Sequence, residues 1–201
     1  MRSDGMVRAL LVSLFSLALM SLSVLVPATA SAHGYTNGPN SRANLCKIGT
    51  VKNCGPIQWE PQSVEGPKGF PARGPVDGTI CAGGLSQFAQ LDDPRGGAWP
   101  TTKLTAGASR TFSWYLTAPH ATTSFRYFIT KNGWTGSAKL TRAALDPAPF
   151  LTVNNGGARP PNAVSHTGTV PAGKTGRHLV LAVWDIADTG NAFYQCIDVN
   201  F

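Results

Sequence analysis

Residues 30–35 combine a predicted processing site with a histidine. Ala30 and Ala32 are small residues directly before His33, and cleavage after Ala32 would make His33 the first residue of the mature protein. The imidazole and the free α-amino group of that residue would then form a two-nitrogen chelate without help from the fold. The sequence therefore predicts a metal site at the start of the mature chain.

A second histidine, His120, follows Pro119 in a loop that leaves a predicted strand, where a ligand can reach across to another loop. The α-amine and the imidazoles of His33 and His120 would form a T-shaped, nearly planar set of nitrogens. Planar nitrogen ligation favours Cu(II), whereas a tetrahedral set with a fourth donor favours zinc. Alone, His120 would be interpreted as a hydrogen-bonded loop residue, but with a terminal histidine it indicates copper. His166 and His178 lie inside alternating strand patterns, which favour a packed or surface role.

The elements that must position these histidines fall into two parts. From about His33 to Arg110 the chain is rich in Gly, Pro, Asn and Ser, with a possible short helix near Leu85 to Leu91 as its only regular pattern. A loop of that length is usually functional. Within it, residues 57–65 place an aromatic ring, two carboxylates and side-chain amides close together.

From Thr111 onward the chain has short β-branched and aromatic segments separated by turn residues. Such spacing predicts an all-β fold, an antiparallel β-sandwich. Residues 33–201 are long enough for one domain with an adequate core, and they contain no internal repeat or linker. The predicted strands are Thr111–Leu116, Ser124–Thr130, Phe150–Val153, Ala163–Val170, Arg177–Ile186 and Phe193–Phe201.

Residues 1–32 have the three-part layout of a secretory signal peptide, with a short basic start, an apolar run from Ala9 to Val26, and a break at Pro27. An uncleaved membrane anchor is the alternative, because the run approaches the roughly 18 residues that span a bilayer. Serines dilute the run, however, and a small-x-small site follows it. We therefore expect a secreted, extracellular protein that has no membrane contact after processing.

Charge and cysteine content fit that location. The net charge of +7 falls to +6 when residues 1–32 are removed, and the positive residues are scattered rather than clustered, which argues against nucleic acid as a partner. Four cysteines in an oxidising compartment favour two disulfides over a four-thiolate metal site. Of three possible pairings, Cys46 with Cys54 would close a small loop and leave Cys81 with Cys196.

Four blocks of sequence resemble the bacterial lytic polysaccharide monooxygenases first described as chitin-binding proteins. They are HGY at 33–35, QWEPQSVEG at 58–66, TAPHATTS at 117–124 and WDIADTGNAFY at 184–194. The resemblance covers essentially all of residues 33–201. It implies an immunoglobulin or fibronectin-III-like sandwich, with a long loop region between the first strands carrying short helices, and one copper ion per chain.

The resemblance also implies roles for single residues. The two candidate ligands match the family's histidine brace. Phe193 matches a non-ligating aromatic residue on one axial side of the copper, where some relatives carry tyrosine, and Ala118 matches a small residue on the other. Glu65 matches a carboxylate near the open coordination position. Trp184 resembles an aromatic residue packed behind the copper, with core packing as an equally plausible role.

A second set of positions resembles the family's flat substrate face, with His120 at its edge. A flat patch with one exposed ring and short polar groups suits a crystalline polysaccharide. The position of Trp59 often holds tyrosine in chitin-active members, so the fine substrate preference stays open. The set is Trp59, Glu60, Pro61, Asp188 and Asn191.

By resemblance, the expected reaction is oxidation of carbon 1 in crystalline chitin to aldonic acid products, with an external electron donor and hydrogen peroxide or dioxygen, by a monomer. The same chemistry on cellulose and a non-catalytic polysaccharide-binding protein are alternatives. A glycoside hydrolase using Glu60 and Glu65 would explain neither His33 nor His120. An exported copper carrier would have no reason for the loop that carries Trp59.

Overall fold

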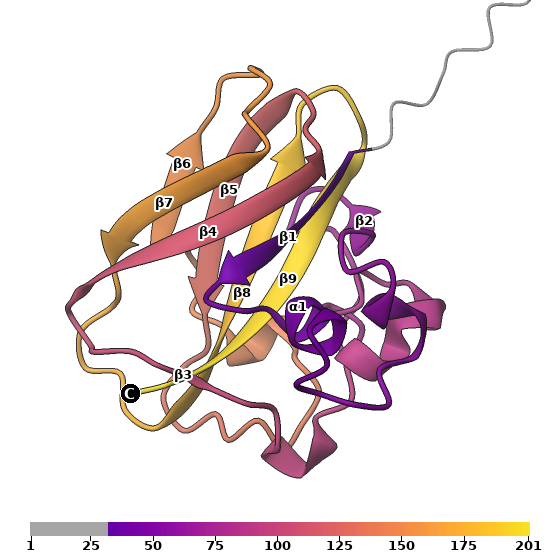
Figure 1. Ribbon diagram of the computed structural model, residues 1–201. Helices are drawn as coiled ribbons and strands as arrows, with labels where there is room; N and C mark the ends of the chain where they lie inside the picture. The colour runs from indigo at the N-terminus through magenta and orange to yellow at the C-terminus, as the bar shows by residue number, and fades with distance from the viewer. Residues whose placement is uncertain (1–31) are drawn as a thin grey trace, which may run out of the picture. The chain divides into compact units, whose positions relative to one another are not determined.

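The computed structural model describes residues 32–201, and it contains two antiparallel sheets that face each other (Figure 1). The smaller sheet has the order β1-β4-β7, from β1 (His33–Gly38), β4 (Ser109–Ala118) and β7 (Ala163–Thr169). The predicted signal peptide lies outside the described residues, apart from Ala32. Within the described part of the chain, no helix has the length and apolar character needed to cross a bilayer.

The larger sheet has the order β2-β9-β8-β5-β6, and β3 pairs in parallel with β9. Its strands come from both halves of the chain, so β9 joins the loop region to the sandwich. Their bounds are β2 (Glu65–Pro67), β3 (Thr102–Lys103), β5 (Thr122–Ile129), β6 (Leu151–Asn154), β8 (Arg177–Ile186) and β9 (Asn191–Asn200).

Residues 39–108, which we call the loop region, lie between β1 and β4. They carry one α-helix and three of the four short 3₁₀ helices, and the fourth follows β5 (Figure 1). The helices are α1 (Arg42–Lys47), η1 (Gly55–Gln58), η2 (Ser86–Leu91), η3 (Arg95–Gly97) and η4 (Arg142–Ala144).

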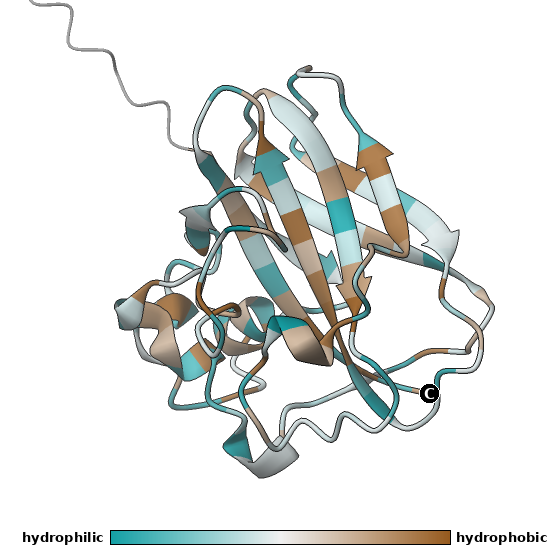
Figure 2. Ribbon diagram, turned by 180° about the vertical axis from the view of Figure 1, so that it is seen from behind, coloured by the Kyte–Doolittle hydropathy of each residue, from teal (hydrophilic) through white to brown (hydrophobic). Residues whose placement is uncertain are grey.

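Two apolar clusters lie on opposite faces of the larger sheet. Between the sheets, the cluster is built from aromatic side chains such as Trp114, Phe125 and Trp184. The other face packs against the loop region through residues such as Tyr194 and Phe70. Because β8 and β9 are covered on both sides, nearly every residue in them is buried. Elsewhere apolar and polar residues alternate along the strands (Figure 2).

The six strands predicted from the alternating pattern are confirmed, with ends shifted by at most a few residues. The short helix predicted near Leu85 to Leu91 is also confirmed, as η2. Apart from that helix, no sequence pattern in residues 33–110 predicted a regular element, and β1, β2, β3 and α1 also lie there. The short helices that the resemblance implied for the long loop region are confirmed. The first turn of α1 is stabilised by Ser41, whose hydroxyl accepts a hydrogen bond from the backbone N–H of Asn44 at 3.2 Å.

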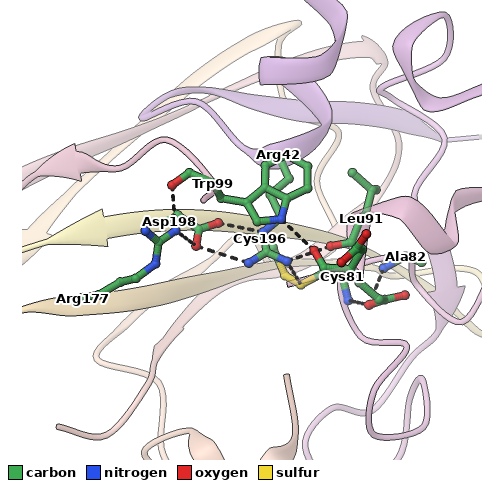
Figure 3. The surroundings of a disulfide bond; sticks show 10 residues. Arg42, Cys81, Ala82, Leu91, Trp99, Arg177, Cys196 and Asp198 are labelled. Atoms are coloured by element: carbon green, nitrogen blue, oxygen red, sulfur yellow. Dashed lines mark hydrogen bonds and ion pairs between the residues drawn. A yellow bond between two sulfur atoms is a disulfide. The ribbon is translucent and has the colours of Figure 1, made fainter. Parts of the chain in front are cut away.

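Both predicted disulfides are confirmed, Cys46–Cys54 within the loop region and Cys81–Cys196 between the loop region and β9. Around the second one, Arg42 donates to Asp198 at 2.7 Å and to the carbonyl of Leu91 at 2.8 Å (Figure 3). The Arg42 guanidinium also lies 4.8 Å from the ring centroid of Trp99. This network attaches the loop region to the last strand of the sandwich.

Candidate metal centre

His33 lies beside the strand that leads to His120. In the β1–β4 ladder, His33 is the register partner of Ala118, two residues before His120. A Cβ on Gly34 would lie 2.6 Å from Leu116 Cδ2 and 3.1 Å from a ring carbon of Trp184, so glycine lets these two buried side chains pack directly against β1. The β1–β4 ladder therefore sets the position of His33.

His120 is oriented by the loop between β8 and β9. Its Nδ1 lies 2.8 Å from Oδ1 of Asp188, and the side chain of His120 is only 11% exposed. The carbonyl of His120 accepts a hydrogen bond from the hydroxyl of Thr122 at 2.8 Å. Nδ1 of His120 is buried, and its contact with Asp188 lacks hydrogen-bond geometry. A ligating histidine commonly has a carboxylate beside its second ring nitrogen, so Nε2 of His120 is the candidate metal ligand.

Glu65 reaches the same area from the loop region. It is the register partner of Phe193 in the β2–β9 ladder, and its Oε1 accepts a hydrogen bond from Nδ2 of Asn191 at 2.8 Å. Phe193 is fully buried, with its ring centroid 6.3 Å from that of His33. One strand pair thus places a carboxylate and an aromatic ring near the first histidine.

Trp184 is part of the core between the sheets. It is fully buried, its ring centroid lies 5.0 Å from that of Phe193, and its Nε1 donates to the hydroxyl of Thr122 at 2.8 Å. Thr122 in turn donates to the carbonyl of His120. Trp184 therefore packs in the core and also supports both Phe193 and the loop that carries His120.

The residues expected on a flat substrate face lie at different depths. The ring of Trp59, at the end of η1, is 81% exposed. Asp188 and Asn191 are exposed, Glu60 is partly exposed, and Pro61 is buried. Trp59 is thus the most prominent apolar side chain available to a flat ligand.

A hollow of about 460 Å³ opens beside His33 and Glu65. We call it the site hollow. Ser63 and Gly66 belong to the block at 58–66, but Pro67 and Leu85 were not expected at the site, because neither lies in a candidate motif. The lining of the site hollow consists of His33, Glu60, Ser63, Glu65, Gly66, Pro67, Leu85 and Asn191.

The other two histidines are packed, as predicted. His166 is 9% exposed and its Nδ1 lies 2.7 Å from the hydroxyl of Tyr127, which accepts a hydrogen bond from Trp114 Nε1. The hydroxyl group of Tyr127 can therefore accept from Trp114 and at the same time donate its proton to Nδ1 of a neutral His166. Burial lowers the pKa of His166 to about 4 and also lowers the pKa of His178. Neither histidine lies at the candidate metal centre.

The donor set fits copper better than zinc. Among residues 32–201, no group of three or more His, Cys, Asp or Glu side chains could hold a metal ion. After cleavage before His33, an α-amine would join the two imidazoles in an all-nitrogen set. Such a set would suit square-planar or T-shaped Cu(II), whereas zinc sites require four donors in a tetrahedron.

Comparison with known proteins identifies the family to which this β-sandwich with its two neighbouring histidines belongs. The family described as "Lytic polysaccharide mono-oxygenase, cellulose-degrading" matches residues 33–199. The chain belongs to this family of copper enzymes, which act on polysaccharides and are generally extracellular.

Similar proteins agree with that assignment. A solved AA10 lytic polysaccharide monooxygenase from Streptomyces lividans is 57% identical, with a TM-score of 0.82 over 84% of this chain and 100% of that one. A Bacillus amyloliquefaciens CBM33 protein solved in complex with Cu(I) is 39% identical, with a TM-score of 0.76 over 84% of this chain and 99% of that one.

A curated relative, GlcNAc-binding protein A of Shewanella oneidensis, is 46% identical over 94% of this chain and 40% of its own length. The chain spans less than two thirds of the length of the curated relatives that it matches first.

Proposed function

We propose that the chain, once cleaved before His33 and exported, binds one copper ion through the α-amine and imidazole of His33 and Nε2 of His120. The observation that carries this proposal is the pairing of His33 with Ala118, next to a His120 whose Nδ1 already faces Asp188. The carboxylate of Asp188 beside Nδ1 favours Nε2 of His120 as the nitrogen that binds the metal.

The neighbouring residues would shape the coordination sphere without binding the metal. Phe193 would place a buried ring beside the metal, and Ala118, the register partner of His33, would add only a methyl group. Glu65, held by Asn191, would orient the oxygen species and assist proton delivery.

The proposed reaction is hydroxylation of carbon 1 in a glycosidic bond. When bound, copper supplies one-electron redox chemistry and the activation of peroxide or dioxygen. With hydrogen peroxide, one oxygen atom enters the C–H bond and the other leaves as water; with dioxygen, two electrons and two protons from a donor are also consumed. The hydroxylated carbon then expels the neighbouring sugar oxygen, which breaks the chain and yields a lactone that hydrates to an aldonic acid.

Crystalline chitin is the proposed substrate. The GlcNAc-binding name of the Shewanella relative supports this choice, and the exposed ring of Trp59 can stack on a sugar. Cellulose is the second candidate, because the description of the matching family names cellulose degradation. The protein would act as a monomer with an external electron donor.

One experiment tests the function. Protein that starts at His33 is loaded with copper and incubated with a reductant and insoluble chitin, and soluble products are analysed by mass spectrometry. Oligosaccharides with aldonic acid ends are expected. Products with native ends would indicate a hydrolase, adsorption without products a binding module, and copper uptake without adsorption a carrier; each of these results contradicts the proposal.

A further inference from the structure

A second hollow of about 310 Å³ lies directly beside the site hollow. We call it the side hollow. The two share three lining residues, while Glu60 belongs only to the first and Val76 only to the second. The side hollow therefore continues the site hollow past Gly66, Pro67 and Leu85. Its lining is Gly66, Pro67, Gly74, Pro75, Val76, Thr79, Gly83, Gly84 and Leu85.

The walls of the side hollow are fixed in place although they contain little regular structure. Arg142 donates hydrogen bonds to the carbonyls of Pro71, Arg73 and Pro75 at 2.7, 3.0 and 2.7 Å. It also pairs with Asp77 at 2.7 Å. Because these three carbonyls all accept hydrogen bonds from the guanidinium of Arg142, the wall is already ordered. A ligand would therefore not lose binding free energy by ordering it.

Backbone contact makes the floor equally rigid. A Cβ added to Gly66 would lie 2.2 Å from the carbonyl oxygen of Gly83, so β2 and the turn at Gly83 touch directly. The hydroxyl of Tyr194 donates to the carbonyl of Pro67 on the same side. The side hollow is thus as well defined as the site hollow that it adjoins.

The chemistry of the lining selects against anions. No charged side chain lines the side hollow. The backbone N–H groups of Gly83, Gly84 and Leu85 all donate internally, at 2.9 to 3.1 Å, and are not available to a ligand. An anion would therefore meet no positive charge in this lining to compensate for the loss of its water.

Two features remain available to a ligand. The side chain of Val76 is 68% exposed and offers an apolar contact. The hydroxyl group of Thr79 donates its hydrogen bond to the carbonyl of Val76 at 2.8 Å, so its oxygen can take part in further hydrogen bonds only as an acceptor. The side hollow therefore matches an uncharged group that combines a methyl with an N–H donor.

We propose that the side hollow binds the acetamido group of a sugar unit next to the unit held at the metal. The acetamido methyl packs against Val76 and Pro75, and its N–H donates to Oγ1 of Thr79. This inference rests on the proposed function, because it assigns a specificity determinant to the same polysaccharide chain. It explains how an enzyme of this kind distinguishes chitin from cellulose, which lacks the group.

The test compares Val76→Asp and Thr79→Val with the parent protein. Ile48→Asp is the matched control, because Ile48 is also exposed, at 55%, but lines neither hollow. Adsorption isotherms are measured on insoluble chitin and on cellulose, with melting temperature and copper affinity recorded for every variant. Val76→Asp should weaken adsorption to chitin about tenfold, and Thr79→Val about threefold, the effect of one neutral hydrogen bond. Adsorption to cellulose should not change.

The outcomes separate the two proposals. Unchanged chitin adsorption by folded Val76→Asp and Thr79→Val would overturn the assignment of the side hollow. Equal losses on chitin and cellulose would overturn the acetamido assignment, since the hollow would then recognise the sugar ring. A parent protein that adsorbs to chitin but releases no oxidised products would instead contradict the proposed reaction, while leaving the adsorption comparison intact.

Discussion

The sandwich and the loop region achieve order by different means. The sandwich is held by long antiparallel ladders and by aromatic packing between its sheets. The loop region has few ladders, and its side chains bind backbone groups directly: Asp92, for example, accepts hydrogen bonds from the N–H groups of Cys81 and Ala82 at 2.8 and 3.3 Å. A sheet tolerates many sequences, whereas such side-chain contacts depend on single residues.

The candidate metal centre lies where the two regions meet. The sandwich contributes both histidines and Phe193, while the loop region contributes Glu65 and Trp59. The difference suggests a division of labour in which the sandwich binds the metal and the loop region handles substrate and protons. Four predictions test this comparison, from the largest expected effect to the smallest.

The two disulfides should differ in their effect on stability. Cys81–Cys196 spans a sequence separation of 115 and Cys46–Cys54 one of 8. By loop entropy, replacing the first pair with serines should lower the free energy of unfolding by about 4.8 kcal/mol, and replacing the second by about 2.5 kcal/mol. Urea denaturation measures both. Equal losses would show that the loop region is not anchored through β9.

Acidification should change the free energy of unfolding in opposite directions through one buried group in each region. His166 in the sandwich has its pKa lowered by burial to about 4, so its contribution to stability is present above pH 6.5 and is lost as the pH falls toward 4. Burial raises the pKa of Asp92 in the loop region to about 6, so its contribution is present below about pH 3.8 and is lost as the pH rises through 6.

Between pH 6.5 and 4, Asp92→Asn should therefore steepen the loss of stability on acidification, and His166→Asn should reduce it. Each change is expected to reach about 3 kcal/mol, because one pKa unit corresponds to about 1.4 kcal/mol. Urea denaturation at several pH values provides the measurement. Parallel pH profiles of the two variants would contradict the opposite signs.

Substitutions from the two regions should separate metal binding from turnover. His120→Ala removes a proposed ligand and should weaken copper binding at least about 100-fold, since even outer-shell partners account for about 10- to 100-fold. Glu65→Gln should leave copper affinity nearly unchanged but slow turnover about 100-fold, as expected for a lost proton-transfer group. Calorimetric titration with copper and product release from chitin give the two readouts. Unchanged turnover in Glu65→Gln would remove its proposed role.

Lys68 should have the smallest effect. Its backbone N–H donates to the carbonyl of Gly190 at 2.8 Å and its Nζ to the carbonyl of Ile186, so it restrains both ends of the loop that carries Asp188. Lys68→Met should reduce turnover about threefold, the effect of one net hydrogen bond, and Lys68→Arg should restore it. Lys131→Met, which removes a lysine–carbonyl bond of 2.9 Å elsewhere, is the control. An equal loss in the control would indicate a general rather than a local effect.

The sequence predicted the parts of the molecule that follow a periodic pattern. Alternation identified the strands from β4 to β9. The even cysteine count predicted two disulfides, and the small loop between Cys46 and Cys54 pointed to the pairs that form. Alternation did not identify β1 or β2, because six residues with two glycines and three residues with one are too short to show a period. The sequence also contains no pattern that predicts the side hollow. Its walls are turns whose backbone carbonyls are held by Arg142, about 70 residues away in the chain.

The two-sided burial of β9 makes this strand unusually intolerant of insertions. Phe193 faces the core between the sheets, while Tyr194 and Cys196 face the loop region. Successive side chains of a strand point to opposite faces, so one extra residue after Asn191 would turn every later side chain around. Phe193 at the candidate metal centre and Cys196 in the anchoring disulfide would then both be displaced by a single inserted residue, although neither had itself been replaced.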